Sequence, residues 1–85
     1  MNTNITSAER LAHVLRDERK KRKLSQSETA KSILMKQSTV SNFENYPDRT
    51  RLDTLFRLLA ALDLELQITN RNENSSDRQA WDQEW

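Results

Sequence analysis

The chain has 85 residues, a length that predicts one small domain. It has no cysteine and one histidine, His13, which excludes disulfides, cysteine metal sites and a zinc site built from histidines. Residues 1–62 hold 12 Lys and Arg against 7 Asp and Glu, whereas residues 63–85 hold 2 against 6. A basic body with an acidic end indicates an anionic partner for the body and a different partner for the end.

The sequence also argues against membrane proteins and enzymes. No apolar run approaches the roughly 20 residues of a membrane span, and the first residues lack the pattern of a secretory signal. The absence of glycine excludes glycine-rich phosphate loops. No Ser-His-Asp set or metal cluster is visible. We therefore expect a soluble cytoplasmic protein that is not an enzyme, with no membrane partner and no cofactor, metal or small-molecule substrate.

The spacing of apolar residues predicts a first helix over residues 6–23. Its inward residues are Leu11, Val14 and Leu15. Thr6 and Glu9 have the spacing of an N-terminal capping box. The basic run at residues 19–23 suits the negative end of the helix dipole and is equally suited to contact phosphate at its last residue, Lys23.

Two short helices are predicted next. Ser25 and Glu28 form a second capping-box pattern before a helix over residues 26–33. A three-residue connection leads to a third helix over residues 37–45. The small side chain of Ala30 lies where the two helices would cross. This arrangement is typical of a helix-turn-helix, in which the second of the two helices enters the major groove of DNA.

The fourth predicted helix covers residues 51–62, after a turn at residues 46–48. Thr50 and Asp53 resemble a third cap. The apolar surface of this helix is too wide for one face, so we expect it to pack on the core and also on a second chain. The residues of this helix that we assign to the dimer contact are Leu59 and Leu62.

The chain changes character after the fourth helix. Leu64, Leu66 and Ile68 alternate with polar residues, which predicts a short strand. Its simplest partner is the same strand of a second copy, in a two-stranded ribbon across a homodimer. Residues 70–85 are polar and aperiodic, so we expect a flexible acidic tail after a DNA-binding and dimerisation domain at residues 1–69.

The outward side of the third helix carries side chains that suit base edges. Gln and Asn pair with adenine, Lys with guanine, and Ser with either. The candidates on or just before this helix are Lys36, Gln37, Ser38, Ser41 and Asn42. We therefore predict that this helix reads double-stranded DNA.

Two runs in this region, LSQSETA at residues 24–30 and STVSNFEN at residues 38–45, resemble the Cro/repressor class of helix-turn-helix domains. The resemblance implies a mainly α bundle of four or five helices that binds DNA as a dimer. It implies a phosphate contact for Gln26 and a purely structural ion pair between Arg19 and Glu44. It also implies base contacts for the outward residues of the third helix. The expected phosphate contacts are Lys23, Gln26, Thr39 and Asn45.

The chain departs from this class at three positions. Leu34 stands where the turn usually has glycine, Thr29 where the first helix of the motif usually has leucine, and Lys36 where a hydroxyl usually caps the second. We expect the turn at Leu34 either to avoid a left-handed backbone or to store about 1 kcal/mol of strain or more.

A longer match covers residues 36–45, 47–48, 64–66 and 84–85 and resembles the HipB-type antitoxins of HipA–HipB toxin–antitoxin modules. The resemblance implies a homodimer that represses its own operon and binds and inactivates a HipA-type Ser/Thr kinase toxin. It implies base reading by Lys36, Gln37, Ser38 and Ser41. The expected location is the bacterial cytoplasm, with nucleoid association when the protein is bound to DNA.

The acidic tail contains two tryptophans, Trp81 and Trp85. Exposed tryptophans often anchor a segment in a partner's pocket, and the kinase is the partner that the resemblance suggests. Alternatively, the two side chains fold back on the domain or have no role. Two other functions stay open: a stand-alone phage-like or metabolic repressor without a toxin partner, and an interaction module whose DNA surface has decayed.

Overall fold

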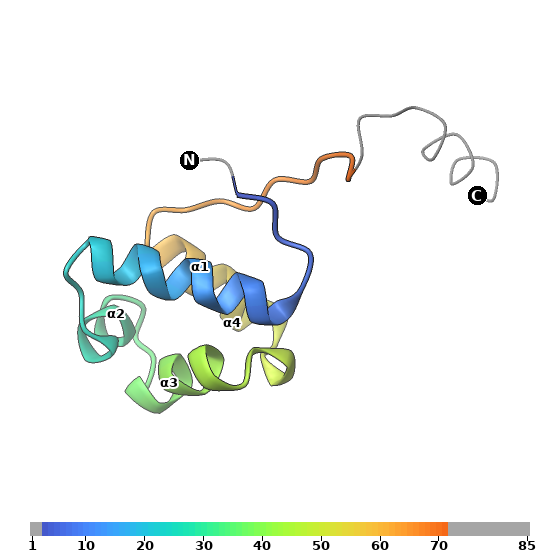
Figure 1. Ribbon diagram of the computed structural model, residues 1–85. Helices are drawn as coiled ribbons and strands as arrows, with labels where there is room; N and C mark the ends of the chain where they lie inside the picture. Colours follow the sequence, from blue (N-terminus) through green and yellow to red (C-terminus); the bar gives the residue numbers. More distant parts are fainter. Residues whose placement is uncertain (1–2, 72–85) are drawn as a thin grey trace.

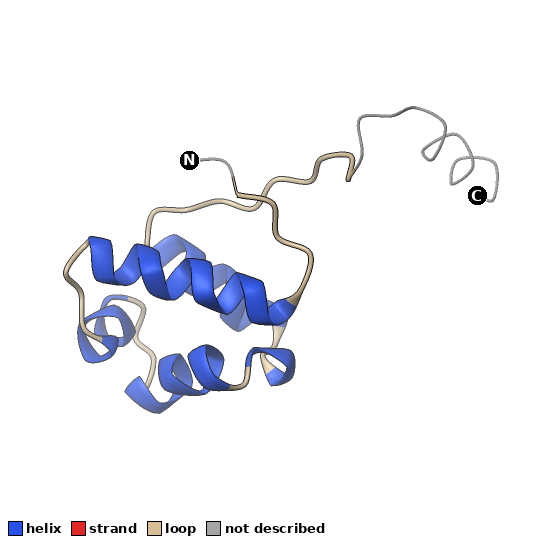
Figure 2. Cartoon of the chain, viewed as in Figure 1, coloured by secondary structure: helices blue, strands red, loops and turns tan. Residues whose placement is uncertain are grey.

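The computed structural model describes residues 3–71, which form four α-helices and one 3₁₀ turn without a β-strand (Figures 1 and 2). The elements are α1 at Ala8–Lys21, α2 at Gln26–Ser32, α3 at Gln37–Asn45, η1 at Pro47–Arg49 and α4 at Leu52–Ala61. The predicted four-helix, mainly α class is confirmed, and every predicted helix end lies within two residues of the observed one.

The helix N-termini confirm one predicted cap and correct two. The Ser25 hydroxyl accepts from the Glu28 amide, and the Glu28 carboxylate accepts from the Ser25 amide, which completes the capping box of α2. In α1 the capping hydroxyl belongs to Ser7 rather than Thr6. The cap predicted at Thr50 is wrong, because the helix begins one residue later and the N-cap has no side-chain bond.

All four helices contribute to one apolar core. In Figure 1, α1 crosses in front of α4, while α2 and α3 lie together on the other side of the bundle. The buried apolar residues are Ala12, Leu15, Ala30, Val40, Phe43, Leu55, Leu58, Leu59 and Leu62. Burial of these side chains holds α2 and α3 against the longer helices, and this packing fixes the helix-turn-helix.

The C-termini of α1, α2 and α4 share one backbone motif, in which the residue after the C-cap is usually glycine. The residue directly after each C-cap has a positive φ, which is 58° at Lys23, 53° at Leu34 and 57° at Asp63. At each end the next residue's amide bonds back to the helix, as in Met35 to the Ala30 carbonyl at 2.8 Å. These are Schellman motifs, and the residue after each left-handed position, Leu24, Met35 or Leu64, packs on the core.

Two residues expected at the dimer contact are buried in the single chain. Leu59 and Leu62 are 5% and 3% exposed within a single chain, because they lie on the inward stripe of α4 and its C-cap. They therefore have almost no surface left for a partner. The exposed apolar residues of α4 are instead Leu52 and Phe56.

Residues 64–71, which follow α4 and its C-terminal turn, do not form regular secondary structure in the single chain. Leu64 packs against the core, whereas Leu66 and Ile68 are exposed. A strand needs a hydrogen-bonding partner, so the intermolecular ribbon stays a prediction. Trp81 and Trp85 lie outside the described residues, as does most of the predicted tail.

Candidate nucleic-acid interface

α3 presents one apolar and one polar side, as the sequence predicts. Val40 and Phe43 are 1% and 3% exposed and face the core. Gln37, Ser38 and Asn42 are exposed, and Ser41 is half-buried. The polar side of α3 is therefore open to a ligand, with amide and hydroxyl groups that can both donate and accept hydrogen bonds.

The ends of α3 differ in how their groups are used. Lys36 precedes the helix as N-cap and makes no side-chain capping bond, so its exposed ammonium group is free of that role. At the other end, the Asn45 amide donates to the Ser41 hydroxyl at 3.2 Å. Thr39, a predicted phosphate contact, is half-buried. Lys23, at the left-handed end of α1, is exposed.

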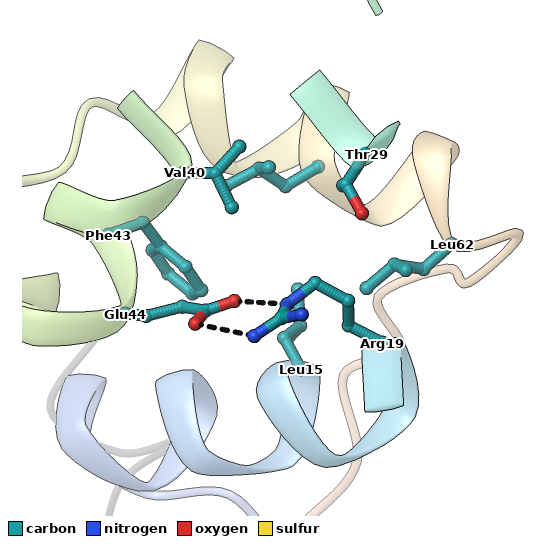
Figure 3. Close-up of a pocket in the computed structure, with 8 residues that line it drawn as sticks. Leu15, Arg19, Thr29, Val40, Phe43, Glu44 and Leu62 are labelled. Carbon is teal, nitrogen blue, oxygen red and sulfur yellow. Dashed lines mark hydrogen bonds and ion pairs between the residues drawn. The ribbon is translucent and has the colours of Figure 1, made fainter. Parts of the chain in front are cut away.

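A buried ion pair lies behind this polar side. The Arg19 Nε donates to Glu44 Oε2 at 2.7 Å and its Nη2 to Oε1 at 3.0 Å, with the two side chains 10% and 7% exposed (Figure 3). Figure 3 shows the pair beside Leu15 and Phe43. The Arg19 Nη1 also donates to the Leu24 carbonyl at 2.8 Å. This guanidinium thus joins α1, the segment before α2, and α3.

The electrostatics of Glu44 keep the pair charged. Burial raises the pKa of this carboxyl, but hydrogen bonds from Arg19 and Gln26 outweigh burial and leave the pKa below its ordinary value. The carboxylate is therefore ionised at neutral pH and available as an acceptor.

A chain of hydrogen bonds leads from the ion pair to the reading side of α3. The Gln26 amide donates to Glu44 Oε1 at 3.0 Å, and the Gln37 amide donates to Gln26 Oε1 at 3.3 Å. Gln26 and Gln37 are the first residues of α2 and α3. The structure thus brings a predicted phosphate contact and a predicted base contact together. Sequence analysis did not predict this link, because residues eleven apart on separate helices meet only through the fold.

The structure also explains the departures from the Cro/repressor pattern. Thr29 is 2% exposed, and its hydroxyl donates to the Ser25 carbonyl at 3.0 Å, so a polar side chain is accommodated in the core. Leu34 takes the left-handed conformation in the turn, and its side chain is 92% exposed. The turn therefore takes the strained, left-handed alternative of the two predicted for it.

Comparison with known proteins places this geometry in a family. A family model described as "Helix-turn-helix" matches residues 15–68. The chain is 39% identical over 82 residues to antitoxin HipB of Escherichia coli O6:H1, which is 95% of this chain and 87% of that protein. It is 38% identical to antitoxin HipB of Escherichia coli K12, of which it covers 93%. The chain belongs to the HipB family of helix-turn-helix antitoxins.

Solved HipB structures share the fold. A HipB–O4 20mer complex matches with a TM-score of 0.82 at 39% identity, over 84% of this chain and 100% of that one. A HipA–HipB–O2–O3 complex matches with a TM-score of 0.82 at 39% identity, over 84% of this chain and 100% of that one. The HipB family is one of DNA-binding antitoxins rather than enzymes.

The described residues of this chain contain neither a metal-binding cluster nor a membrane-spanning helix. Within residues 3–71, no group of three or more His, Asp or Glu side chains is placed to hold a metal ion. None of the helices in that range has the length and apolar character to traverse a bilayer. The polar side of α3 is therefore the candidate binding surface.

Proposed function

We propose that this protein is an antitoxin and transcriptional autorepressor. As a homodimer it binds operator DNA with α3 and binds and neutralises a HipA-type Ser/Thr kinase toxin. One observation carries the proposal: 39% identity to a HipB antitoxin over 95% of the chain. The open polar side of α3 and the helix-turn-helix geometry agree with it. We propose no catalytic activity and no cofactor, and a cytoplasmic location with nucleoid association when the protein is bound to DNA.

We assign base reading to α3 and the residue before it, and phosphate binding to flanking positions. The base-reading residues are Lys36, Gln37, Ser38, Ser41 and Asn42. The phosphate-binding residues are Lys23, Gln26, Thr39 and Asn45. Amide, hydroxyl and ammonium groups of this kind read base edges in the major groove. The +5 charge of residues 1–62 favours association with DNA through release of counterions.

The rest of the proposal concerns assembly. Residues 1–69 form the DNA-binding and dimerisation domain, with Leu64, Leu66 and Ile68 in a ribbon between two copies. Residues 70–85 form the tail, and Trp81 and Trp85 anchor it in the kinase. The acidic composition of this tail suits a protein partner better than DNA.

Operator binding is tested with the DNA upstream of the protein's own gene. Fluorescence anisotropy should give specific binding that weakens steeply with salt, because several phosphates are neutralised. Gln37→Ala should weaken binding by about 1–3 kcal/mol and relax the preference at one base pair. Asn70→Ala removes an amide from an exposed residue outside the helix-turn-helix and the ribbon and should leave binding unchanged. A flat salt profile, or equal binding by the Gln37→Ala variant, would contradict the assignment.

Kinase binding is tested separately. The full-length protein should co-purify with a HipA-type kinase and block its phosphotransfer, whereas a chain ending at residue 69 should bind operator but lose kinase affinity. Equal kinase affinity of the two chains would sink the tail assignment. Operator binding without any kinase binding would instead favour the alternative of a stand-alone phage-like repressor.

A further inference from the structure

The carbonyl groups that follow α2 have an unusual partner. The Schellman motif at this end uses the carbonyls of Ala30 and Lys31. In the turn that follows, the carbonyls of Ile33 and Leu34 accept no backbone hydrogen bond within the described residues. Both instead accept from Nη2 of Arg57 on α4, the Leu34 carbonyl at 3.5 Å. One guanidinium thus covers the turn of the helix-turn-helix from outside the motif.

The chemistry of this contact fits its place. A cation near the end of a helix interacts favourably with the free carbonyls and the negative end of the dipole. Charge-assisted hydrogen bonds are also stronger than neutral ones. Arg57 reaches the turn from 24 residues away in sequence. It therefore ties the turn to α4, which lies in the core of the bundle.

The other two left-handed turns show what is particular to this one. At the end of α1, Nη1 of Arg19 donates to the Leu24 carbonyl. At the end of α4, the described residues provide no side-chain donor to the Asp63 or Leu64 carbonyl. α2 is thus held by an arginine on each flank, before it by Arg19 and after it by Arg57.

The turn covered by Arg57 leads directly into α3. Lys36 and Gln37 follow within four residues of Ile33. We propose that Arg57 is a positioning residue for DNA reading: its hydrogen bonds hold the strained turn at Leu34, and the turn sets the start of α3. This inference rests on the proposed operator binding, since the reading is done by α3.

The proposal requires that Arg57 and Leu34 be coupled. Leucine is disfavoured in the left-handed conformation, so a contact from outside the turn, added to the backbone hydrogen bonds, helps to keep it. Glycine adopts that conformation without a steric penalty. Arg57 should therefore matter for a chain with Leu34 and matter much less after Leu34→Gly.

The first experiment measures backbone exchange in the free protein. Arg57→Met should speed hydrogen exchange at the Met35 amide at least fivefold. The Leu64 amide, which occupies the same position in the α4 motif, should change less than twofold. The control Lys31→Met removes one positive charge from the last turn of α2, and its side chain makes no hydrogen bond in the described residues. Lys31→Met should leave the hydrogen-exchange rates of both amides unchanged. Unchanged exchange at Met35 after Arg57→Met would overturn the proposal.

The second experiment measures operator affinity below the unfolding temperature of each variant. Arg57→Met should weaken specific binding at least fivefold while leaving the salt slope unchanged, and Arg57→Lys should recover part of the loss. In the Leu34→Gly background the same substitution should cost less than twofold. If Arg57→Met lowers the slope of log affinity against log salt concentration by about one, Arg57 is a phosphate contact, and the positioning role is overturned. An equal loss in both backgrounds would also overturn it.

The two experiments separate this inference from the proposed function. If the unsubstituted protein fails to bind its operator, the proposed function fails, and the exchange experiment still decides whether Arg57 holds the turn. If the operator is bound with unchanged affinity after Arg57→Met, the proposed function stands and the positioning role is wrong.

Discussion

Gln37 donates a hydrogen bond to Gln26 at 3.3 Å, which joins the first residue of α3 to the first residue of α2. Gln26 in turn donates to Glu44, the acceptor of the buried Arg19 guanidinium. A side chain on the reading side of α3 is thus oriented by an ion pair in the core. Hydrogen bonds in series restrict each side chain to fewer rotamers, and such restriction favours binding.

This link predicts that Gln26 affects DNA reading more than folding. Gln26→Ala removes the acceptor of Gln37 and should lower operator affinity by about 1–3 kcal/mol. The free energy of unfolding should fall by about 1.5 kcal/mol, the lower end for a hydrogen bond to a charged group, because the bond from Gln26 to Glu44 is only partly buried. Anisotropy and urea unfolding measure the two effects. Ser27→Ala, an exposed neighbour on α2, is the matched control, and equal losses in the two variants would contradict the prediction.

The ion pair predicts that the losses of unfolding free energy on substituting Arg19 and Glu44 do not add in the double variant. The Arg19 side chain is 10% exposed, so Glu44→Leu leaves its guanidinium buried without its carboxylate and should cost about 3 kcal/mol of unfolding free energy. Arg19→Met should cost a similar amount. The double variant replaces the pair with apolar side chains and should be less destabilised than either single one. Urea unfolding of the four chains tests this, and additive losses would show that the two charges are not coupled.

Stability should also fall in acid. The pKa values of Glu18, Glu28 and Glu44 lie below the ordinary 4.5 in the folded protein. Since the folded-state values are the lower ones, their stabilisation is present above pH 4.5 and is lost as pH falls through the folded pKa values. Urea midpoints between pH 3 and 7 should therefore drop only at the acidic end. Glu44→Gln should flatten this drop, and a curve as steep as that of the unsubstituted chain would contradict a role for Glu44.

The sequence predicts local features of this protein better than contacts between elements. The Ser25–Glu28 capping box and all helix positions follow from short-range patterns, and the structure confirms them. The cap at Ser7 was missed because the adjacent Thr6 has a similar hydroxyl at a plausible spacing. The dimer role expected for Leu59 and Leu62 is disfavoured by their burial in the single chain, because periodicity identifies apolar stripes and does not say which one the chain's own core covers.

The turn at Leu34 predicts a substitution that stabilises the fold. Leu34 is left-handed and its side chain is 92% exposed, so Leu34→Gly relieves a steric penalty without losing packing. The free energy of unfolding should rise by about 0.5–1 kcal/mol, since the relief is partly offset by the greater entropy of the unfolded chain. Leu34→Ala keeps the Cβ atom and should not stabilise. Equal urea midpoints for the Gly and Ala variants would show that the turn is not strained.

The proposed ribbon predicts that two groups of apolar residues respond differently to substitution. Leu66 and Ile68 are exposed in the single chain, so Leu66→Asp and Ile68→Asp should leave the helices folded and convert the proposed dimer to a monomer. Leu62→Ala should instead cost about 2–5 kcal/mol of unfolding free energy, because it opens a cavity in the core. Sedimentation and circular dichroism measure assembly and helix content. If both Asp variants sediment as dimers, the ribbon is not the interface, and the exposed Leu52 and Phe56 of α4 become the next residues to substitute.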